Sequence, residues 1–452
     1  MIDLAVGCSS GGLIALSRFM LRMDNESCKS LFKTLAKKVF SPSLRKRFFH
    51  SWVSDSFYDV QPLEEALKNH YTPTQRMFDA PMSGVSACKV AVTTTTIKDG
   101  DAFIFANYNG TAPHRVESAY GRLRPNNDQE PFLWQIARAT TAAPPKYELM
   151  NESLFPPIEI DGITYQDGGM KRHNNPINLA LSEARHLWPT SPNPDVLISL
   201  GTGSTTPGSV PAISRYRNFL VDGWMSRIYR SFSSSFDGEN AWREVSGLMN
   251  KTCRESSFRF DLSVPGGLPR LDDTECMARL SAMVHSPSFG VSNHKEAATA
   301  LLTTCFFLKL DSVPSYYAGL FQCAGTIRCR APAQHVIRCL DILDPSRKDL
   351  YKDNIKLGVY ISTHDICSHC HKYNRPIRFI VRDLEESIVV SLCSGDKLHR
   401  LSAFPNSMQW FVEQQGLNQK FGGSNHRFEA KEECPVCEAR AGGVRKRKYI
   451  EV

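Results

Sequence analysis

Apolar and polar residues alternate over the first 205 residues in a pattern that predicts strands and helices in turn. Met1 to Val6 has the short apolar run of a strand, Gly7 to Gly11 has the composition of a tight turn, and a helix follows from Gly12. From Asn25 to Phe40, apolar residues fall on one helical face and lysines on another, and Ser41-Pro42 ends that helix. This order of elements is typical of an α/β domain.

Three further runs predict strands at Lys89 to Thr95, Ala102 to Ala106 and Asp195 to Leu200. The last run is almost continuously apolar, so we expect this strand to be buried on both faces of a sheet. Together with the flanking helices, these strands predict an α/β fold built on a mixed, mostly buried sheet.

The pattern changes beyond residue 205. Ser204 to Pro211 has the composition of a loop, and helical segments then continue to about residue 345. From Gly358 onward, short strand-like runs at Ile377 to Val381 and Ser387 to Leu392 alternate with turns rich in histidine and cysteine. We therefore predict a boundary near residue 350, and three parts: a core over 1–205, a helical remainder over 206–350, and a small Cys/His-rich module over 351–452.

Composition is that of a folded protein, with 42% hydrophobic and 22% charged residues in a chain of 452. No run approaches the ~20 uncharged apolar residues of a membrane-spanning helix, so we expect any membrane contact to be peripheral. Fourteen cysteines without the plan of a signal peptide favour a reducing compartment, the cytoplasm. A net charge of +8 is modest for this length, and we expect no nucleic-acid partner.

Gly7-Cys-Ser-Ser-Gly11 has the form G-x-S-x-G of a nucleophile elbow. Small residues on both sides let a serine occupy a strained turn between a strand and a helix, with its hydroxyl exposed. The pattern by itself also fits an ordinary Gly- and Ser-rich turn. The strand predicted before it and the helix predicted after it favour the elbow, because the helix N-terminus brings N–H groups near Ser9. Ser9 is therefore the candidate nucleophile.

A second candidate lies in Tyr165-Gln-Asp-Gly-Gly169, although an aspartate before two glycines is common turn chemistry. Its context is more specific. Asp3 to Leu16 resembles the nucleophile segment of the patatin-like phospholipase family almost position for position, and Gln166 to Pro176 resembles the family's aspartate segment. Supporting blocks follow in the family's order at Phe103 to Asn109, Ala137 to Pro144 and Ile198 to Gly203.

The resemblance covers residues 1–205, and more weakly the chain to about 330. It implies a three-layer α/β domain around a central mixed sheet, and a serine esterase of phospholipase A type that acts in lipid catabolism on lipid or phospholipid substrates. Ser9 would attack the acyl carbonyl, and Asp167 would accept the proton without a histidine. No cofactor and no calcium are required for this scheme. The motif glycines that support the two residues are Gly7, Gly11, Gly12, Gly168 and Gly169.

Two alternatives remain open at this stage. The first is a Ser-His-Asp hydrolase with His173 or His186 as the base, although an elbow nine residues from the start leaves no room for the strands that precede it in an α/β-hydrolase. The second is a catalytically silent binding or scaffold protein. The family carries a Gly-rich oxyanion segment upstream of the elbow, and the sequence begins after that point. We therefore expect only the backbone N–H of Ser10 to donate to the oxyanion, and we expect slow hydrolysis.

The C-terminal part contains two C-x-x-C pairs, which suggest a structural zinc site. The spacing between the pairs is 63 residues, longer than in a zinc ribbon, so a small domain would have to fold between them. Free thiols in a reducing cell are the alternative. His369, His371 and Cys393 are potential substitutes for one ligand. The candidate ligands are Cys367, Cys370, Cys434 and Cys437.

Two basic clusters could contact anionic surfaces. Arg45, Lys46 and Arg47 precede Phe48-Phe49, a combination suited to a lipid interface as well as to a solvated loop. The tail from Arg445 to Lys448 is the second cluster, and it does not assign a location.

Overall fold

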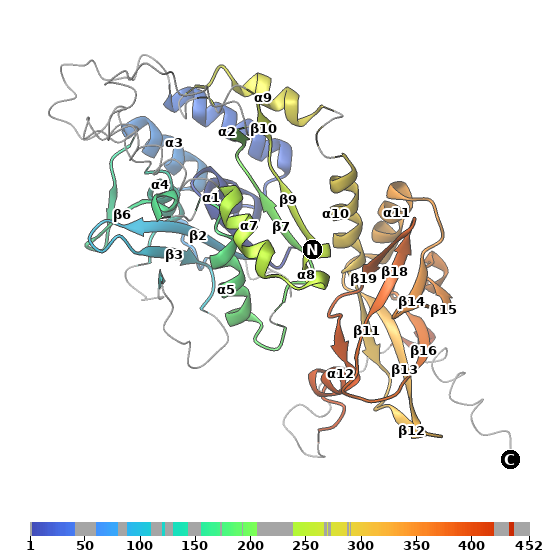
Figure 1. Cartoon of the computed structure of the whole chain (residues 1–452). Helices are drawn as coiled ribbons and strands as arrows, with labels where there is room; N and C mark the ends of the chain where they lie inside the picture. Colours follow the sequence, from blue (N-terminus) through green and yellow to red (C-terminus); the bar gives the residue numbers. More distant parts are fainter. Residues whose placement is uncertain are drawn as a thin grey trace, which may run out of the picture. The chain divides into compact units, whose positions relative to one another are not determined.

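The computed structural model describes residues 2–40, 60–79, 88–109, 120–122, 130–142, 155–171, 174–191, 193–205, 238–265, 269, 273–286, 289, 291–419 and 434–437. Its contacts divide the chain into two compact units (Figure 1). The N-terminal unit contains residues 2–194 and 198–290, and the C-terminal unit contains residues 195–197 and 291–452.

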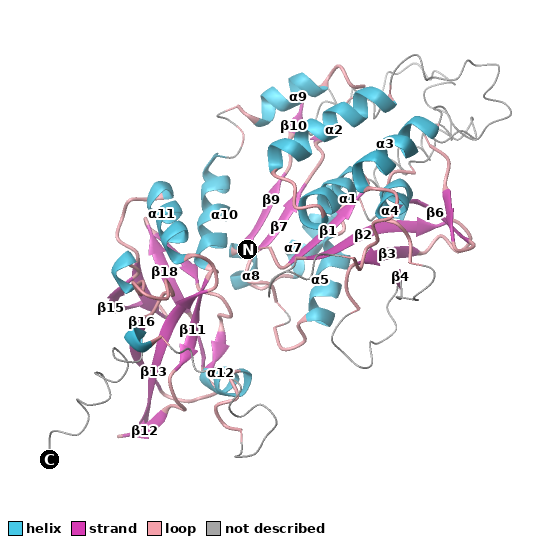
Figure 2. Ribbon diagram, turned by 180° about the vertical axis from the view of Figure 1, so that it is seen from behind, coloured by secondary structure: helices cyan, strands magenta, loops and turns pink. Residues whose placement is uncertain are grey.

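The N-terminal unit is built on a six-stranded mixed sheet of order β4-β3-β2-β6-β5, with β1 also paired to β2 (Figure 2). β1 runs parallel to β2, and β3 and β6 run antiparallel to it, so the predicted mixed sheet is confirmed. The strands are β1 (Leu4–Cys8), β2 (Lys89–Thr96), β3 (Ala102–Ala106), β4 (Gly121–Arg122), β5 (Ile158–Ile160) and β6 (Ile163–Asp167).

Helices cover both faces of this sheet. Successive side chains of a strand point to opposite faces, and the buried side chains of β2 follow that rule: Val90 and Val92 pack with α1, α3 and α4, whereas Ala91 packs with α5. The three-layer arrangement is therefore confirmed. These helices are α1 (Ser10–Ala15), which continues as the π-helical turn η1 (Leu16–Met20), α2 (Asn25–Val39), α3 (Gln61–Tyr71), α4 (Leu133–Thr140), η4 (Gly168–Lys171) and α5 (Ile177–Leu187).

The amphipathic helix predicted from Asn25 is α2. It begins after Asp24, whose carboxylate accepts a hydrogen bond of 2.8 Å from the Ser27 N–H and so caps the helix. The predicted stop at Ser41-Pro42 lies outside the described residues.

The strand predicted at Asp195 to Leu200 forms as β7 (Leu197–Leu200), but the prediction that it is buried on both faces was wrong. β7 pairs with β9 (Ser257–Phe260) in a two-stranded sheet, and Leu200 is 74% exposed. The apolar run thus predicted a strand correctly, but it did not predict which strands flank it or how far its side chains are buried. The rest of the unit contains β8 (Ser204–Thr205), α7 (Gly238–Leu248), α8 (Lys251–Glu255), β10 (Ser263–Val264) and α9 (Met277–Val284).

The C-terminal unit has its own hydrophobic core between two four-stranded sheets and three helices. One sheet has the order β11-β13-β12 with β16 also on β13, and the other has the order β15-β14-β18-β19. Its elements are α10 (Val291–Thr303), β11 (Phe306–Leu310), β12 (Ser315–Tyr317), β13 (Leu320–Cys329), α11 (Ala333–Leu343), β14 (Asp349–Lys352), β15 (Ile355–Tyr360), η5 (Thr363–Asp365), β16 (Arg375–Val381), β17 (Ser387–Ile388), β18 (Val390–Ser394), β19 (Lys397–Arg400), β20 (Asn406–Ser407) and α12 (Met408–Gln414).

This unit begins near residue 291, whereas the sequence pattern predicted a boundary near 350. β16 pairs with β13 from Phe321↔Val381 to Ile327↔Arg375, so one sheet includes strands from both sides of residue 350. The segment from Phe306 to Cys329 forms strands where helices were expected. Its period of two is visible in β11, where Phe306, Leu308 and Leu310 are buried and the residues between them are not.

Candidate active site

Ser9 lies between the last residue of β1 and the first residue of α1, with φ 52° and ψ −123°. A positive φ is costly for a residue other than glycine, and such strain is typical of a nucleophile elbow. Gly7 makes the turn possible, because a Cβ there would lie 2.3 Å from the Gly11 carbonyl oxygen. Gly12 permits close packing, since its Cβ would lie 3.0 Å from side-chain atoms of Val92 and Thr140.

Sheet register brings the elbow to Asp167. β3 occupies one edge of β2 from Ala91 to Thr95, which leaves the opposite edge to both β1 and β6. β1 ends with Cys8 paired to Thr93, and β6 ends with Asp167 paired to Thr94. The carboxyl ends of the two strands therefore meet at one point along β2, and Asp167 reaches the nucleophile turn across 159 residues of sequence from Cys8.

Hydrogen bonds fix both candidate residues. The Ser9 N–H donates to Oγ1 of Thr140 at 2.8 Å, and that hydroxyl donates to the Thr93 carbonyl at 2.8 Å. The Ser9 hydroxyl is close enough to Asp167 to lower the pKa of its carboxyl, so the two side chains are neighbours. The Gly169 N–H donates to Oδ1 of Asp167 at 2.9 Å, so one motif glycine orients the carboxylate directly.

The remaining motif glycines differ in their steric roles. A Cβ at Gly168 would lie 2.7 Å from Oγ1 and 2.8 Å from the carbonyl oxygen of Thr93, so this position requires glycine. Among the described atoms, a Cβ at Gly11 would meet nothing within 4 Å. The sequence motif treats Gly7 and Gly11 alike, but only Gly7 is held to glycine by close contacts.

Burial alters the protonation of the aspartate. Asp167 is 5% exposed, and desolvation raises its pKa above the ordinary value. Hydrogen bonds from Gly169, Ser9 and Cys8 oppose that rise by stabilising the charged form. A carboxylate with raised proton affinity next to a serine hydroxyl is suited to accept a proton from it.

Residues 1–181 match the family model of patatin-like phospholipases. This match delimits a patatin-like domain within the chain. Over 281 residues the chain is 27% identical to calcium-independent phospholipase A2-gamma of Mus musculus, a match that covers 61% of the chain and 32% of the relative. It is 30% identical to the Homo sapiens protein of that name over 213 residues, or 45% of the chain and 24% of the relative. Phospholipase A I of Arabidopsis thaliana is 26% identical over 247 residues, covering 45% of the chain and 18% of the relative. The matches thus span a third or less of each relative's length.

The structure describes only one of the two histidines that were considered as alternative bases, His186. His186 lies near the end of α5, and its Nδ1 is 2.7 Å from the carbonyl oxygen of Ser182 on the same helix. His173 lies outside the described residues.

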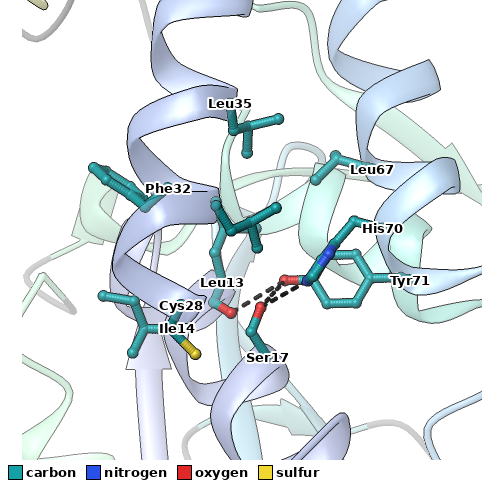
Figure 3. A pocket seen from close by; sticks show the side chains of 10 residues that line it. Leu13, Ile14, Ser17, Cys28, Phe32, Leu35, Leu67, His70 and Tyr71 are labelled. Atoms are coloured by element: carbon teal, nitrogen blue, oxygen red, sulfur yellow. Dashed lines mark hydrogen bonds between the residues drawn. The ribbon is translucent and has the colours of Figure 1, made fainter. Parts of the chain in front are cut away.

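An apolar crevice lies beside the helix that follows the nucleophile (Figure 3). Its volume, counted together with the space open to solvent, is about 350 Å³, and side chains of α1, η1, α2 and α3 line it. Ser17 forms its polar base, with Oγ 3.1 Å from both Nε2 of His70 and the Tyr71 hydroxyl. Neither Ser9 nor Asp167 lines this crevice, so it is separate from the proposed reacting groups.

Among the described residues, no helix is long and apolar enough to cross a membrane.

The structure also brings together the four predicted metal ligands. The sulfur atoms of Cys367, Cys370, Cys434 and Cys437 all lie within 4.8 Å of one another. Of the potential substitutes, His369 has its Nδ1 3.8 Å from the Cys434 sulfur. His371 belongs to the same turn with φ 57°, and Cys393 lies on β18 with its thiol 3.3 Å from the Gly395 carbonyl.

Two contacts of the patatin-like site were not predicted as such. The hydroxyl of Thr140 accepts a hydrogen bond from the Ser9 amide. Thr140 lies within the block Ala137 to Pro144, whose resemblance to the family was the sequence feature that could have pointed to this residue. Cys8 lies inside the motif and reaches the carboxylate of Asp167. Both basic clusters, Arg45 to Arg47 and Arg445 to Lys448, lie outside the described residues.

Proposed function

We propose that the patatin-like domain hydrolyses fatty-acyl esters of lipids, with Ser9 as the nucleophile and Asp167 as the general base. The observation that carries the proposal is that β1 and β6 end side by side on β2, which brings the serine on the strained elbow to the buried carboxylate of Asp167. The sulfur of Cys8, the residue before the serine, lies 3.6 Å from Oδ1 of that carboxylate. The substrate class is supported by the family match and by three relatives that are named phospholipases.

The mechanism follows from these two side chains. Oγ of Ser9 attacks the acyl carbonyl carbon while Asp167 takes the hydroxyl proton. The C–O bond to the alcohol then breaks, and Asp167 returns the proton to the leaving alkoxide. Water then attacks the acyl-enzyme while Asp167 accepts a proton from it. The ester bond to Oγ of Ser9 breaks, Asp167 returns the proton to Oγ, and the fatty acid leaves.

The tetrahedral intermediate carries negative charge on the former carbonyl oxygen. Ser10 is the first residue of α1, and an N–H at that position has no acceptor within the helix. We assign this N–H the role of donor to the oxyanion that forms next to Ser9. The dipole of the helical segment favours the same charge.

The test is fatty-acid release from phospholipid vesicles by the wild type and by Ser9→Ala and Asp167→Asn. Ser30→Ala is the matched control, because Ser30 is an exposed serine on α2 of the same unit. We expect both site variants to lose nearly all release and the control to retain it. Full release by Ser9→Ala would refute the assignment of the nucleophile.

A fluorophosphonate probe provides a second measurement that does not depend on the choice of lipid. It reacts with an activated serine, so we expect labelling of Ser9 in the wild type and none in Ser9→Ala. The alternative of a silent binding protein predicts vesicle binding without labelling and without fatty-acid release. That combination in the folded wild type would replace the hydrolase proposal.

A further inference from the structure

We propose that Cys367, Cys370, Cys434 and Cys437 bind one zinc ion, and that this ion fastens residues 434–437 to the C-terminal unit. The site is independent of the proposed lipid hydrolysis, since neither Ser9 nor Asp167 belongs to the cluster. Each ligand position is supplied by a thiolate, which makes the site closed and structural rather than catalytic.

Sulfur spacing fits a tetrahedral zinc centre. The Cys367 and Cys434 sulfurs are 3.6 Å apart, and so are those of Cys370 and Cys437. A Zn–S bond of about 2.3 Å in a tetrahedron gives S···S edges of about 3.8 Å. A disulfide would require about 2.05 Å, and all four residues are free cysteines. Each C-x-x-C pair contributes one member to each of these two close contacts.

The turn around the first pair has the geometry of a metal-binding knuckle. The Cys367 N–H donates to the Lys372 carbonyl at 2.9 Å, and the His371 N–H donates to the Cys367 carbonyl at 2.9 Å. These two bonds close the turn that presents the Cys367 and Cys370 sulfurs.

The second pair receives a donor from the core of the unit. Nδ2 of Asn374 lies 3.4 Å from the Cys437 sulfur. The Asn374 side-chain oxygen in turn accepts from the guanidinium of Arg328 on β13. This chain of contacts connects the Cys437 ligand to a strand of the sheet, as outer-shell partners do at metal centres.

The segment at residues 434–437 supplies the second pair of ligands. Its sequence is Cys-Pro-Val-Cys, and Cys434 is only 6% exposed, with its sulfur 3.6 Å from that of Cys367. Metal–thiolate bonds supply folding free energy directly. The ion would therefore join this segment to a knuckle that is separated from it by 63 residues of the chain.

His369 is a competing ligand, because its Nδ1 lies 3.8 Å from the Cys434 sulfur. Two features favour cysteine. Cys434 is buried with its sulfur 3.6 Å from that of Cys367, and the four sulfurs all lie within 4.8 Å of one another. We therefore assign four sulfurs, with the imidazole outside the first coordination sphere.

The test uses the full chain, purified under reducing conditions without added metal and measured by elemental mass spectrometry. We expect about one zinc per chain, and less than ~0.3 zinc per chain with the C-terminal unit folded would overturn the proposal. Iron in place of zinc, or disulfides between these cysteines in protein kept from air, would overturn it as well. Replacement by Co(II) should give the absorption of a tetrahedral four-thiolate centre, and a three-sulfur, one-nitrogen spectrum would overturn the ligand assignment.

Variants separate metal binding from general folding. Cys370→Ser and Cys437→Ser should lose most of the zinc and lower the melting temperature of the C-terminal unit. Cys339→Ser, at an exposed cysteine on α11, is the matched control and should retain both. Full zinc content in either cluster variant would overturn the proposal, and the wild-type metal content tests it even where a variant fails to fold.

Discussion

The Cys8 sulfur lies 3.6 Å from Oδ1 of Asp167, and its thiol donates a hydrogen bond to that carboxylate. Burial, together with the nearby charge of Asp167, raises the pKa of the Cys8 thiol well above its ordinary value, so the thiol stays protonated and remains a donor. A donor to the charged form lowers the pKa of Asp167. Cys8 therefore opposes the effect of burial on the proposed base.

Replacing Cys8 should shift the pH dependence of hydrolysis. Cys8→Ala removes the donor, so the pKa of Asp167 rises, and the acid limb of kcat/KM for fatty-acid release moves to higher pH. Cys8→Ser supplies another donor and should return the limb toward its wild-type position. A limb that stays in place in Cys8→Ala would show that the thiol does not influence the base. Cys28→Ala, at a buried cysteine of α2, is the control.

Ser9 and Asp167 should behave as one unit. If the hydroxyl cannot act without its base, Ser9→Ala and Asp167→Asn each remove nearly all activity, and the double variant loses no more than either single variant. Rates of fatty-acid release from the three proteins measure this. Losses that multiply in the double variant would mean that the two residues act independently.

Thr140 should stabilise the elbow through its hydroxyl. Thr140→Val keeps the shape but leaves the Ser9 N–H and the Thr93 carbonyl without this partner, which costs about 1–3 kcal/mol of unfolding free energy. Urea denaturation of the N-terminal unit measures this loss. Thr140→Ser retains the hydroxyl and should remain close to the wild type in stability. Equal stability of all three proteins would contradict the role assigned to the hydroxyl.

The two outer glycines of the motif should respond differently to the same substitution. Gly7→Ala forces a Cβ to within 2.3 Å of the Gly11 carbonyl oxygen, and we expect a loss of about 1–3 kcal/mol or more. Gly11→Ala adds a Cβ to α1 that meets no atom of the described residues within 4 Å, and we expect a gain of about 0.5–1 kcal/mol because glycine is unfavourable in a helix. Thermal unfolding of the pair, with the wild type beside them, measures both. Similar effects at the two positions would contradict the steric distinction.

Stability of the C-terminal unit should depend on Asp344 in acid. Hydrogen bonds from Ser346, Ser394 and Gly395 hold the pKa of Asp344 well below its ordinary value of about 3.9. A depressed folded-state pKa stabilises the unit fully above the unfolded pKa, and this contribution is lost as pH falls below about 4. We expect Asp344→Asn to be less stable than the wild type at pH 7 and to lose less of its melting temperature between about pH 5 and 3. Parallel losses in the two proteins would contradict this.

The local sequence pattern was sufficient to predict those features that depend only on residues close together in the sequence. The strand before Ser9, the helix from Asn25, and the strands β2 and β3 all follow from periodicity and turn residues within short windows. The nucleophile turn is also local, because Gly7 and Gly11 approach each other across only the residues of the motif. The two C-x-x-C pairs could be read in the same way.

Tertiary structure decided which distant segments meet. Asp167 approaches Ser9 because β1 and β6 share one edge of β2 and end at adjacent residues, and no local pattern specifies the order of strands in a sheet. The same reason explains the unit boundary, since the pairing of β13 with β16 unites segments that composition separates. The cluster of four cysteines is likewise a result of long-range packing, because its two C-x-x-C pairs come from distant segments of the chain. The sequence by itself determined the residues able to do chemistry, whereas sheet order and long-range packing determined their partners, because those depend on the whole chain burying its apolar surface at once.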